Sequence, residues 1–316
     1  MLTISSVLGV DLPFALAQVR TLDAVVRHGS FSRAAAELKL TQPAVSMQVR
    51  QLETALGLPL VERMGKRAFA TRAGELLLEH AARAVRELET AVQMMQRLRG
   101  RVAGRIRIGT SASLSIYVLP PVFRSFRARH PEVELIVVTG NAPEIAQAIV
   151  ANQLDIGITS LPVRERELTV LPFCEDEQVA IAPRRAPWRS RRRITAAELA
   201  LHPLILFERG GTVHRVIEEW FHRAGVTPRG VMELGNTEAI KKLVGAGLGL
   251  SIVSHFTVDG GGRVGGVVAM SLDPPLIHQR GIILRRDKPR TPALDALLAA
   301  LRDVRFTRRR RSTRVR

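Results

Sequence analysis

Apolar side chains recur at three- and four-residue spacing along the first hundred residues, a pattern typical of amphipathic helices. The first stripe predicts a helix over residues 14–28, whose core face carries Leu16, Val19, Leu22, Val25 and Val26. Ser32 is a candidate N-cap of a second, shorter helix, because a serine hydroxyl accepts from the free N–H groups of a first turn. The packing face of that helix is made of small alanines, which let a neighbouring helix approach closely.

A third helix follows a tight turn at residues 39–40. Thr41 is its candidate N-cap, and Pro43 is tolerated in the first turn, where its nitrogen needs no partner. One stripe of this helix is apolar, whereas the other face carries donors and acceptors that suit base edges and phosphates, namely Gln42, Ser46, Gln48 and Arg50. Two helices packed through alanines, the second with a polar N-terminal half, predict a helix-turn-helix.

Two short strands and a long helix follow. Strands over residues 60–63 and 68–71 predict a winged helix in which basic side chains lie along phosphates, although a solvated basic hairpin is the alternative. Residues 72–99 form a predicted helix of roughly 40 Å, whose apolar positions alternate steps of four and three. Such a heptad seam favours dimerisation over packing on its own domain. The seam consists of Leu77, Ala81, Ala84, Leu88, Ala91, Met95 and Leu98.

Strands alternate with helices after the glycines at residues 100–104, which predicts an α/β domain. The predicted strands cover residues 106–109, 133–139, 155–159, 168–173, 178–182, 204–207, 231–234 and 250–253. The predicted helices cover residues 118–129, 143–152, 212–224, 237–245 and 293–302.

Three strand-to-helix junctions of this domain are rich in small polar residues. They carry Ser111, Ser113, Thr212 and Thr237. Helix N-termini attract anions, and strand ends in open α/β sheets are where ligands bind. Capping of its own helix is the simpler interpretation for any one of these hydroxyls, but three junctions together favour a small anionic ligand. His214, Arg215 and Lys241 fit this site and the protein surface equally well.

Composition narrows the function classes. A chain of 316 residues with 46% hydrophobic residues suits two folded domains, and a net charge of +18 favours a polyanionic partner, nucleic acid before acidic membrane. The single Cys174 excludes an internal disulfide and a cysteine-based metal cluster, which suits a reducing cytoplasm. We find no signal peptide, membrane span, metal-ligand spacing or catalytic constellation, so the sequence predicts a cytoplasmic protein that is not an enzyme and needs no metal or cofactor.

The motifs of the first half together resemble a known family. Residues 29–35 (Gly-Ser-Phe-Ser-Arg-Ala-Ala), 41–46 (Thr-Gln-Pro-Ala-Val-Ser) and 56–63 (Leu-Gly-Leu-Pro-Leu-Val-Glu-Arg) are similar to the DNA-binding domain of LysR-type transcriptional regulators. The resemblance implies a two-lobed effector domain of the periplasmic-binding-protein type. Its effector cleft would use the positions of Ser111, Ser113, Thr212 and Thr237.

The resemblance also implies a division of the chain. An all-α winged helix-turn-helix domain would span residues 13–71, a long coiled-coil linker helix residues 72–100 and an α/β effector-binding domain residues 101–305. Within the effector domain, lobe I would cover about 101–174 and 277–305 and lobe II about 175–276, and residues 306–316 would form a basic disordered tail. A second basic run, residues 184–193, is expected to be a solvated loop.

We therefore expect a sequence-specific transcriptional regulator that binds an interrupted palindrome in double-stranded DNA as a homodimer or homotetramer and responds to a small-molecule effector. RNA polymerase is a further partner that the resemblance admits. A small-molecule binding protein with an incidental N-terminal domain is the alternative. The residues expected to contact DNA are Ser32, Arg33, Thr41, Gln42, Pro43, Ala44, Ser46, Gln48, Arg50, Arg63, Lys66 and Arg67.

Overall fold

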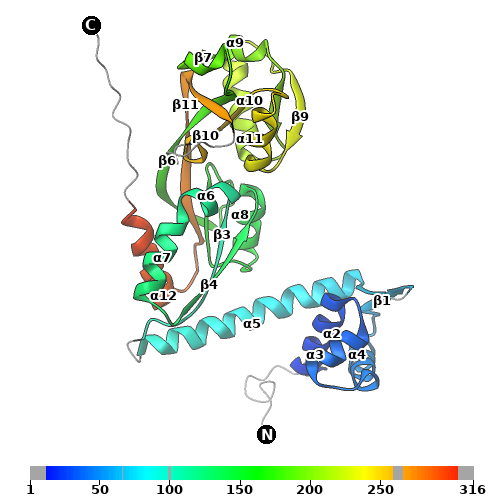
Figure 1. Ribbon diagram of the computed structural model, residues 1–316. Coiled ribbons are helices and arrows are strands. Elements are labelled where there is room, and N and C mark those ends of the chain that lie inside the picture. Colours follow the sequence, from blue (N-terminus) through cyan, green and yellow to red (C-terminus); the bar gives the residue numbers. More distant parts are fainter. Residues whose placement is uncertain (1–11, 66, 99–100, 259–265, 305–316) are drawn as a thin grey trace. The chain divides into compact units, whose positions relative to one another are not determined.

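The computed structural model describes residues 12–65, 67–98, 101–258 and 266–304, and for residues 96–98 it describes the backbone alone. The chain divides into two compact units, Met1–Glu89 and Thr90–Arg316. Figure 1 shows helices in the first unit and a mixture of strands and helices in the second.

The N-terminal unit is a winged helix-turn-helix, as predicted. Its elements are α2 (Leu16–His28), α3 (Phe31–Leu38), α4 (Gln42–Leu56), β1 (Val61–Met64), β2 (Arg67–Ala70) and the start of α5 (Arg72–Leu98). Ala34 and Ala35 of α3 are buried against Val45 and Val49 of α4, so the small side chains bring these helices together as the alanine pattern indicates. The second part of the core joins Leu22 of α2 to residues of α4 and α5.

Helix boundaries in this unit differ from the prediction at two positions. The N-cap of α3 is Ser30 and not Ser32, because α3 begins at Phe31 and the Ser30 hydroxyl accepts from the backbone N–H of Arg33 at 3.4 Å. Leu16 was expected in the core but is 45% exposed, since it is the first residue of α2 and lies beyond the packed part of that helix. The cap of α4 is as predicted, with Thr41 accepting from the N–H of Ala44 at 3.3 Å.

The wing is a two-stranded antiparallel ribbon fastened to the helices at its base. The carboxylate of Glu53 on α4 accepts from the backbone N–H groups of Leu60 and Val61 at 2.8 and 3.2 Å. Thr71 caps α5 by accepting from the N–H of Gly74 at 3.1 Å, and its own hydroxyl donates to the carbonyl of Pro59. The first wing strand begins one residue later than predicted and the second one residue earlier, and Val61 pairs with Ala70.

Helix α5 carries two different packing surfaces along the predicted seam. Leu77 and Ala81 are partly buried against the core of their own N-terminal unit, and their place in a dimer seam stays a prediction. Further along, Leu88 is 51% and Met95 63% exposed, and Ala84 and Ala91 are exposed as well. Val85 and Val92, which the heptad pattern omits, are 46% and 57% exposed. The side chain of Leu98 lies outside the described residues.

The second unit is built on a mixed seven-stranded sheet. The strand order is β10-β6-β11-β5-β3-β4, with β7 (Arg193–Thr195) beside β11, and a separate pair of parallel strands, β8 (Leu204–Phe207) and β9 (Gly230–Leu234). The large sheet comprises β3 (Gly104–Thr110), β4 (Val133–Thr139), β5 (Ile156–Ser160), β6 (Leu168–Pro183), β10 (Ser251–Ser254) and β11 (Val267–Arg285). The helices are α6 (Ala112–Tyr117), α7 (Leu119–Arg129), α8 (Ala142–Val150), α9 (Ala196–Ala200), α10 (Thr212–Arg223), α11 (Thr237–Gly245) and α12 (Pro292–Arg302), with short 3₁₀ turns at Trp188–Ser190 and His255–Thr257.

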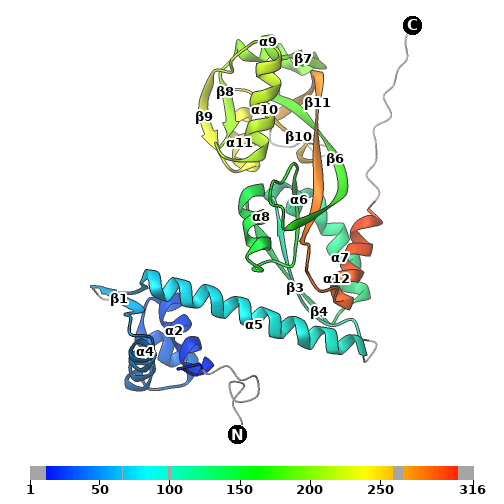
Figure 2. The same cartoon turned by 180° about the vertical axis from the view of Figure 1, so that it is seen from behind.

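The hydrophobic clusters of this unit lie in two lobes. The core of lobe I includes Ile108, Phe126 and Leu297, and the core of lobe II includes Trp220 and Phe221. Strands β6 and β11 are antiparallel partners from Leu168↔Arg285 to Pro183↔Val267 and contribute to both cores. Figures 1 and 2 show these two strands running side by side from one lobe into the other.

Three sequence-based boundaries change in this unit. The predicted strands 168–173 and 178–182 are one strand, because the polar residues between them include Asp176, which is fully buried in an ion pair with Arg280. The return of the chain to lobe I, expected at about residue 277, lies within β11, whose 19 residues run from Val267 to Arg285. The single helix expected over 118–129 is preceded by α6, and the two helices meet at Val118.

Candidate DNA-binding face and effector cleft

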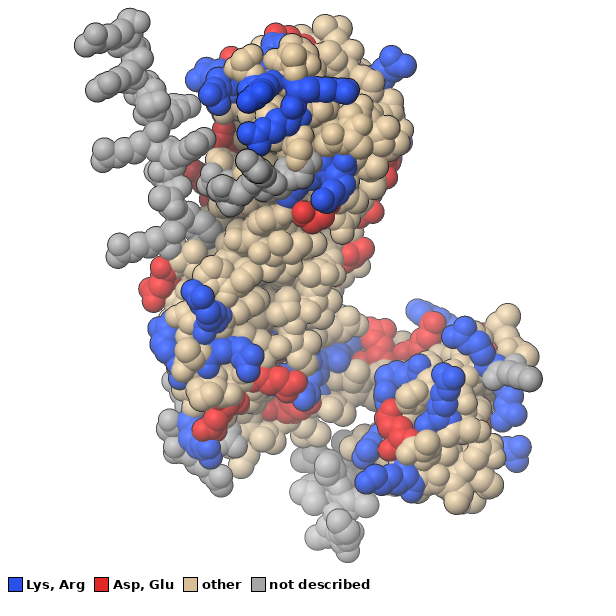
Figure 3. Space-filling model, in the orientation of Figure 1, with Lys and Arg blue, Asp and Glu red and all other residues tan. Residues whose placement is uncertain are grey.

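The outer face of α4 carries exposed polar side chains. Gln42 and Arg50 are exposed and Ser46 is half-buried, and the Gln42 amide Nε2 donates to the Ser46 hydroxyl at 2.9 Å. These residues line a shallow surface depression together with Pro43, Met47, Gln51, Thr54, Ala55 and Arg63. In Figure 3 many Lys and Arg side chains lie on the visible face of this unit. The structure thus brings Gln42, Ser46 and Arg50 onto one surface of a helix that is packed from behind.

Gln48 does not share that surface. Its carboxamide Oε1 accepts from the hydroxyl of Thr21 on α2 at 2.5 Å, so this side chain is turned towards the helix packed behind α4. The spacing explains the difference, because Gln48 is three residues after the buried Val45 and four before the buried Leu52, and residues at these spacings share a helix face. Ser32 and Arg33 are exposed on α3.

Two arginines of the wing lie over aromatic rings. The guanidinium carbon of Arg63 is 4.7 Å from the ring centroid of Phe31, and that of Arg67 is 5.1 Å from the ring centroid of Phe69. A stacked guanidinium keeps its N–H groups free at the ring edge and loses less side-chain freedom when it binds an anion. Lys66, the third predicted wing residue, lies outside the described residues.

The effector domain contains a cavity of about 320 Å³ between its lobes. All four predicted effector residues line it, so the three polar junctions, which are far apart in the sequence, meet at one place. They lie at the starts of α6, α10 and α11, and Asn141 at the start of α8 lines the same cavity. The volume is in the lower part of the range of small-molecule sites.

The hydroxyls at these junctions do not all serve as caps. Ser111 caps α6 by accepting from the N–H of Leu114 at 3.4 Å, and its oxygen is also 3.4 Å from that of Ser113. Helix α10 has Gly211 as its N-cap and receives no side-chain cap, whereas Asn236 caps α11. The interpretation as simple caps therefore holds for Ser111 but not for Thr212 or Thr237. The first turn of α10 keeps its N–H groups available towards the cavity.

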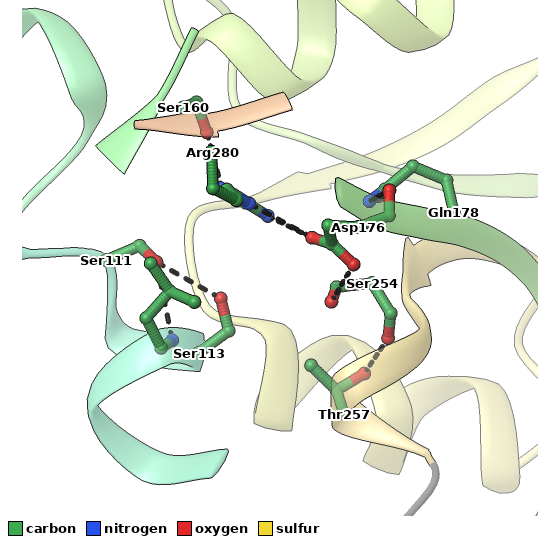
Figure 4. Close-up of polar contacts among 9 residues, drawn as sticks. Ser111, Ser113, Ser160, Asp176, Gln178, Ser254, Thr257 and Arg280 are labelled. Carbon is green, nitrogen blue, oxygen red and sulfur yellow. Dashed lines mark hydrogen bonds and ion pairs between the residues drawn. The ribbon is translucent and has the colours of Figure 1, made fainter. Parts of the chain in front are cut away.

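Buried polar residues of β5, β6, β10 and β11 form the floor of the cleft (Figure 4). Ser160, Gln178, Ser254 and Arg280 line the cavity, and Asp176 is bonded to two of them. The guanidinium of Arg280 donates through Nε and Nη2 to Oδ2 of Asp176, at 3.0 and 2.5 Å, and through Nη1 to the hydroxyl of Ser160. The Ser254 hydroxyl donates to Oδ1 of Asp176 at 2.6 Å, and Gln178 lies next to this group. None of these residues was predicted from the sequence, because Asp176 lies in the acidic run 175–177 between two predicted strands and Arg280 lies outside every predicted strand.

A second polar contact joins the two lobes beside the cleft. The Tyr117 hydroxyl on α6 donates to the carboxylate of Glu238 on α11 and accepts from Nζ of Lys241 at 2.5 Å. Lys241 is only 2% exposed, so its predicted surface alternative is wrong. Burial, together with the bond to Glu238, raises the pKa of Tyr117 above its ordinary value. For Glu238, burial alone would raise the pKa, but the bonds from Tyr117 and Lys241 outweigh it and the pKa is lowered.

The remaining candidates offer little chemistry. Within the described ranges, no cluster of three or more His, Cys, Asp or Glu side chains could hold a metal ion. Burial, and then the charge of Asp176, raises the pKa of the Cys174 thiol to about 12, which keeps it in its unreactive protonated form. No helix in the described part of the chain is long and apolar enough to cross a membrane.

A winged helix-turn-helix and a polar cleft between two α/β lobes, joined in one chain by a long helix, define a ligand-responsive DNA-binding regulator. Comparisons with known proteins agree. Residues 16–75 match the model of the bacterial regulatory helix-turn-helix protein, lysR family, and residues 99–305 match the LysR substrate binding domain. The chain belongs to the LysR family of transcriptional regulators, which are DNA-binding regulators and not enzymes.

Several relatives are similar over almost the whole chain. The RuBisCO operon transcriptional regulator of Allochromatium vinosum is 34% identical over 89% of this chain and 93% of its own length. The regulator CbbR of Rhodospirillum rubrum is also 34% identical, over 92% of this chain and 96% of its own. Among solved structures, full-length CbnR in complex with its target DNA has a TM-score of 0.73 at 22% identity and covers 92% of this chain and 99% of that one. This last likeness concerns the fold.

Proposed function

We propose that α4 is the recognition helix and that Gln42, Ser46 and Arg50 contact base edges in the major groove. The observation that carries this proposal is their shared exposed face, on which the bond between Gln42 and Ser46 already fixes the carboxamide. Glutamine and arginine suit this role because each can form two hydrogen bonds with a purine edge. Arg63 and Arg67 of the wing contact phosphates in this arrangement, and Lys66 stays a prediction of the same kind.

The other predicted DNA contacts divide by position. Ser32 and Arg33 are exposed at the start of α3 and are proposed to bind phosphates. Thr41, Pro43 and Ala44 lie at the start of α4. Pro43 has no N–H and the N–H of Ala44 is bonded to Thr41, so we propose that the N–H of Gln42 and the helix dipole attract a phosphate here. For Gln48 we propose no base contact, since its oxygen is already bonded to Thr21.

We propose that α5 pairs with a second copy through its distal part. Val85, Leu88, Val92 and Met95 follow one another at steps of three, four and three, and all are exposed. A helix face with this spacing buries its apolar side chains against a partner helix. Two recognition helices would then read two half-sites of an interrupted palindrome, and further contacts would lead from a homodimer to a homotetramer. RNA polymerase is a further proposed partner.

We propose that the cleft binds a small anionic metabolite that modulates DNA binding. The open N-terminus of α10 and the hydroxyls of Ser111, Ser113, Thr212 and Thr237 support this assignment. The names of the relatives suggest the target, so we further propose that this chain regulates an operon for RuBisCO or related carbon assimilation, in the cytoplasm.

Selection of bound duplexes from random DNA, at near-physiological salt, tests the DNA-binding assignment. We expect an interrupted palindrome whose half-sites are spaced by whole helical turns and which also occurs upstream of the RuBisCO operon of the source genome. Gln42→Ala and Ser46→Ala should each weaken binding to the selected duplex by about 1–3 kcal/mol, measured by fluorescence anisotropy. Gln153→Ala, at an exposed glutamine of the effector domain, is the matched control and should change nothing.

The salt dependence of DNA affinity tests the proposed phosphate contacts of the wing. Arg63→Ala should weaken binding to all duplexes alike and reduce the slope of log K against log salt by about one. Enrichment of no sequence, with binding that vanishes as salt rises, would contradict sequence-specific recognition. Equal losses for Gln42→Ala and Gln153→Ala would contradict the assignment of the recognition face.

A further inference from the structure

The charges on the floor of the effector cleft compensate each other. The carboxylate of Asp176 takes two hydrogen bonds from Arg280 and one from Ser254, so the positive charge of Arg280 is neutralised inside the protein. Both members of the pair are buried, with 0% of Asp176 and 3% of Arg280 exposed. Arg280 is therefore not the counter-ion of an incoming anion. The floor instead presents neutral hydrogen-bonding groups.

One of these groups has no partner. Gln178 lines the cavity and is 1% exposed, and its Oε1 is buried with no hydrogen-bond donor among the described residues. Its Nε2 donates to the backbone carbonyl of Asp176 at 3.4 Å, which fixes the direction of the carboxamide. Buried polar atoms without a partner are rare in folded proteins because burial removes the hydrogen bond that water would supply. The cavity that Gln178 lines is the place from which its missing donor can come.

The start of α10, which also lines the cavity, favours a negatively charged group. Helix α10 has 12 residues and begins with Gly211, Thr212 and Val213 at the cavity, and its first turn has no side-chain cap. The N–H groups of an uncapped first turn and the helix dipole favour an anion at this end. The cavity thus has an anion-binding wall at α10 and an unmet acceptor at Gln178.

We propose that Gln178 is a specificity-determining residue of the cleft, which accepts a hydrogen bond from a hydroxyl or amino group of an anionic ligand bound at the N-terminus of α10. The inference rests on the proposed effector function of the cleft. It assigns the ligand a class, a small anion that also carries a hydrogen-bond donor. A plain carboxylate without such a donor leaves Oε1 of Gln178 unpaired and binds more weakly.

Matched pairs of small anions test this assignment on the full-length protein. The pairs are malate and succinate, lactate and propionate, aspartate and succinate, and glycerol 3-phosphate and propyl phosphate, each differing by one or two donor groups. Isothermal titration calorimetry should show at least one pair in which the donor-bearing member binds tenfold or more tightly, equivalent to about 1.4 kcal/mol.

Two variants locate the discrimination at Gln178. Gln178→Met keeps the length of the side chain and removes the acceptor, so it should weaken the donor-bearing member about tenfold and leave its partner within about twofold. Gln153→Met, at the exposed glutamine of lobe I, should preserve the preference. If Gln178→Met disturbs folding, Gln178→Asn takes its place. It keeps the amide on a shorter side chain and should give an intermediate preference.

Three results would overturn the proposal. They are no binding of any donor-bearing probe at millimolar concentration, equal binding within every pair, or a preference that survives in Gln178→Met. Equal binding would mean that water satisfies Gln178. Anisotropy with the selected duplex keeps this test separate from the proposed function. Intact DNA binding together with absent discrimination refutes the ligand class alone, whereas absent specific DNA binding refutes the regulatory assignment.

Discussion

The buried ion pair of the cleft floor gives the sharpest stability prediction. Asp176→Asn removes one charge while nearly preserving shape, and it leaves the guanidinium of Arg280 charged, 3% exposed and without a counter-ion. Two unit charges about 4 Å apart at an effective dielectric constant of 20 attract each other by about 4 kcal/mol. Breaking a buried pair by removing one partner costs about 3–5 kcal/mol in general. We therefore expect the variant to lose about 4 kcal/mol of unfolding free energy.

Both tryptophans of the chain report on this change. Trp188 and Trp220 lie in the core of lobe II, together with Ala180 and Ala182 of the strand that carries Asp176. Urea unfolding followed by tryptophan fluorescence therefore measures the stability of that lobe. With an m-value of about 2.5 kcal/mol/M, the midpoint should fall by about 1.5 M.

An exposed ion pair provides the control. Asp287 pairs with Arg285 but is 71% exposed, so Asp287→Asn should cost less than about 1 kcal/mol. If Asp176→Asn behaves like this control, water from the cleft solvates Arg280 and the floor is not a dry, neutral network. The reasoning about the charge of the cleft would then fail.

Three further predictions concern other parts of the molecule. Gly74→Ala places a Cβ 2.2 Å from the carbonyl oxygen of Leu60, so it should destabilise the DNA-binding domain by about 2–3 kcal/mol, and an unchanged helical melting curve would contradict this packing. Burial, and then a nearby guanidinium charge, lowers the pKa of His278 to about 3. Because the unfolded histidine takes up a proton near pH 6.5, the folded state should lose about 1.4 kcal/mol per pH unit below that value, and His278→Leu should show a weaker loss between pH 7.5 and 5.5 in urea titrations. Tyr117 is the only tyrosine, so its ionisation can be followed by absorbance. We expect this ionisation above pH 10, and at a lower pH in Glu238→Gln than in the unchanged protein. Ionisation at or below pH 10 in the unchanged protein would refute the burial of Tyr117 beside Glu238.

The sequence by itself determined the helix-turn-helix and most of the elements of the effector domain. Their signals are local, since a cap such as Thr41 or a buried stripe such as Val45 and Val49 depends on residues within one or two turns. The four hydroxyl residues that line the cavity were also predicted from the sequence. Small hydroxyl residues at the start of a helix are recognisable without knowing which other helix starts lie nearby.

Only the tertiary structure decided which long-range partners share a site. Asp176 and Arg280 are 104 residues apart, and both fall outside the predicted strands. Only the pairing of β6 with β11 brings them together and neutralises both charges. The same holds for the seam of α5, where Leu77 packs within its own unit while Leu88, with identical periodicity, stays exposed. Periodicity specifies the face of a helix that is apolar, but the identity of the surface that covers it depends on the folding of distant segments.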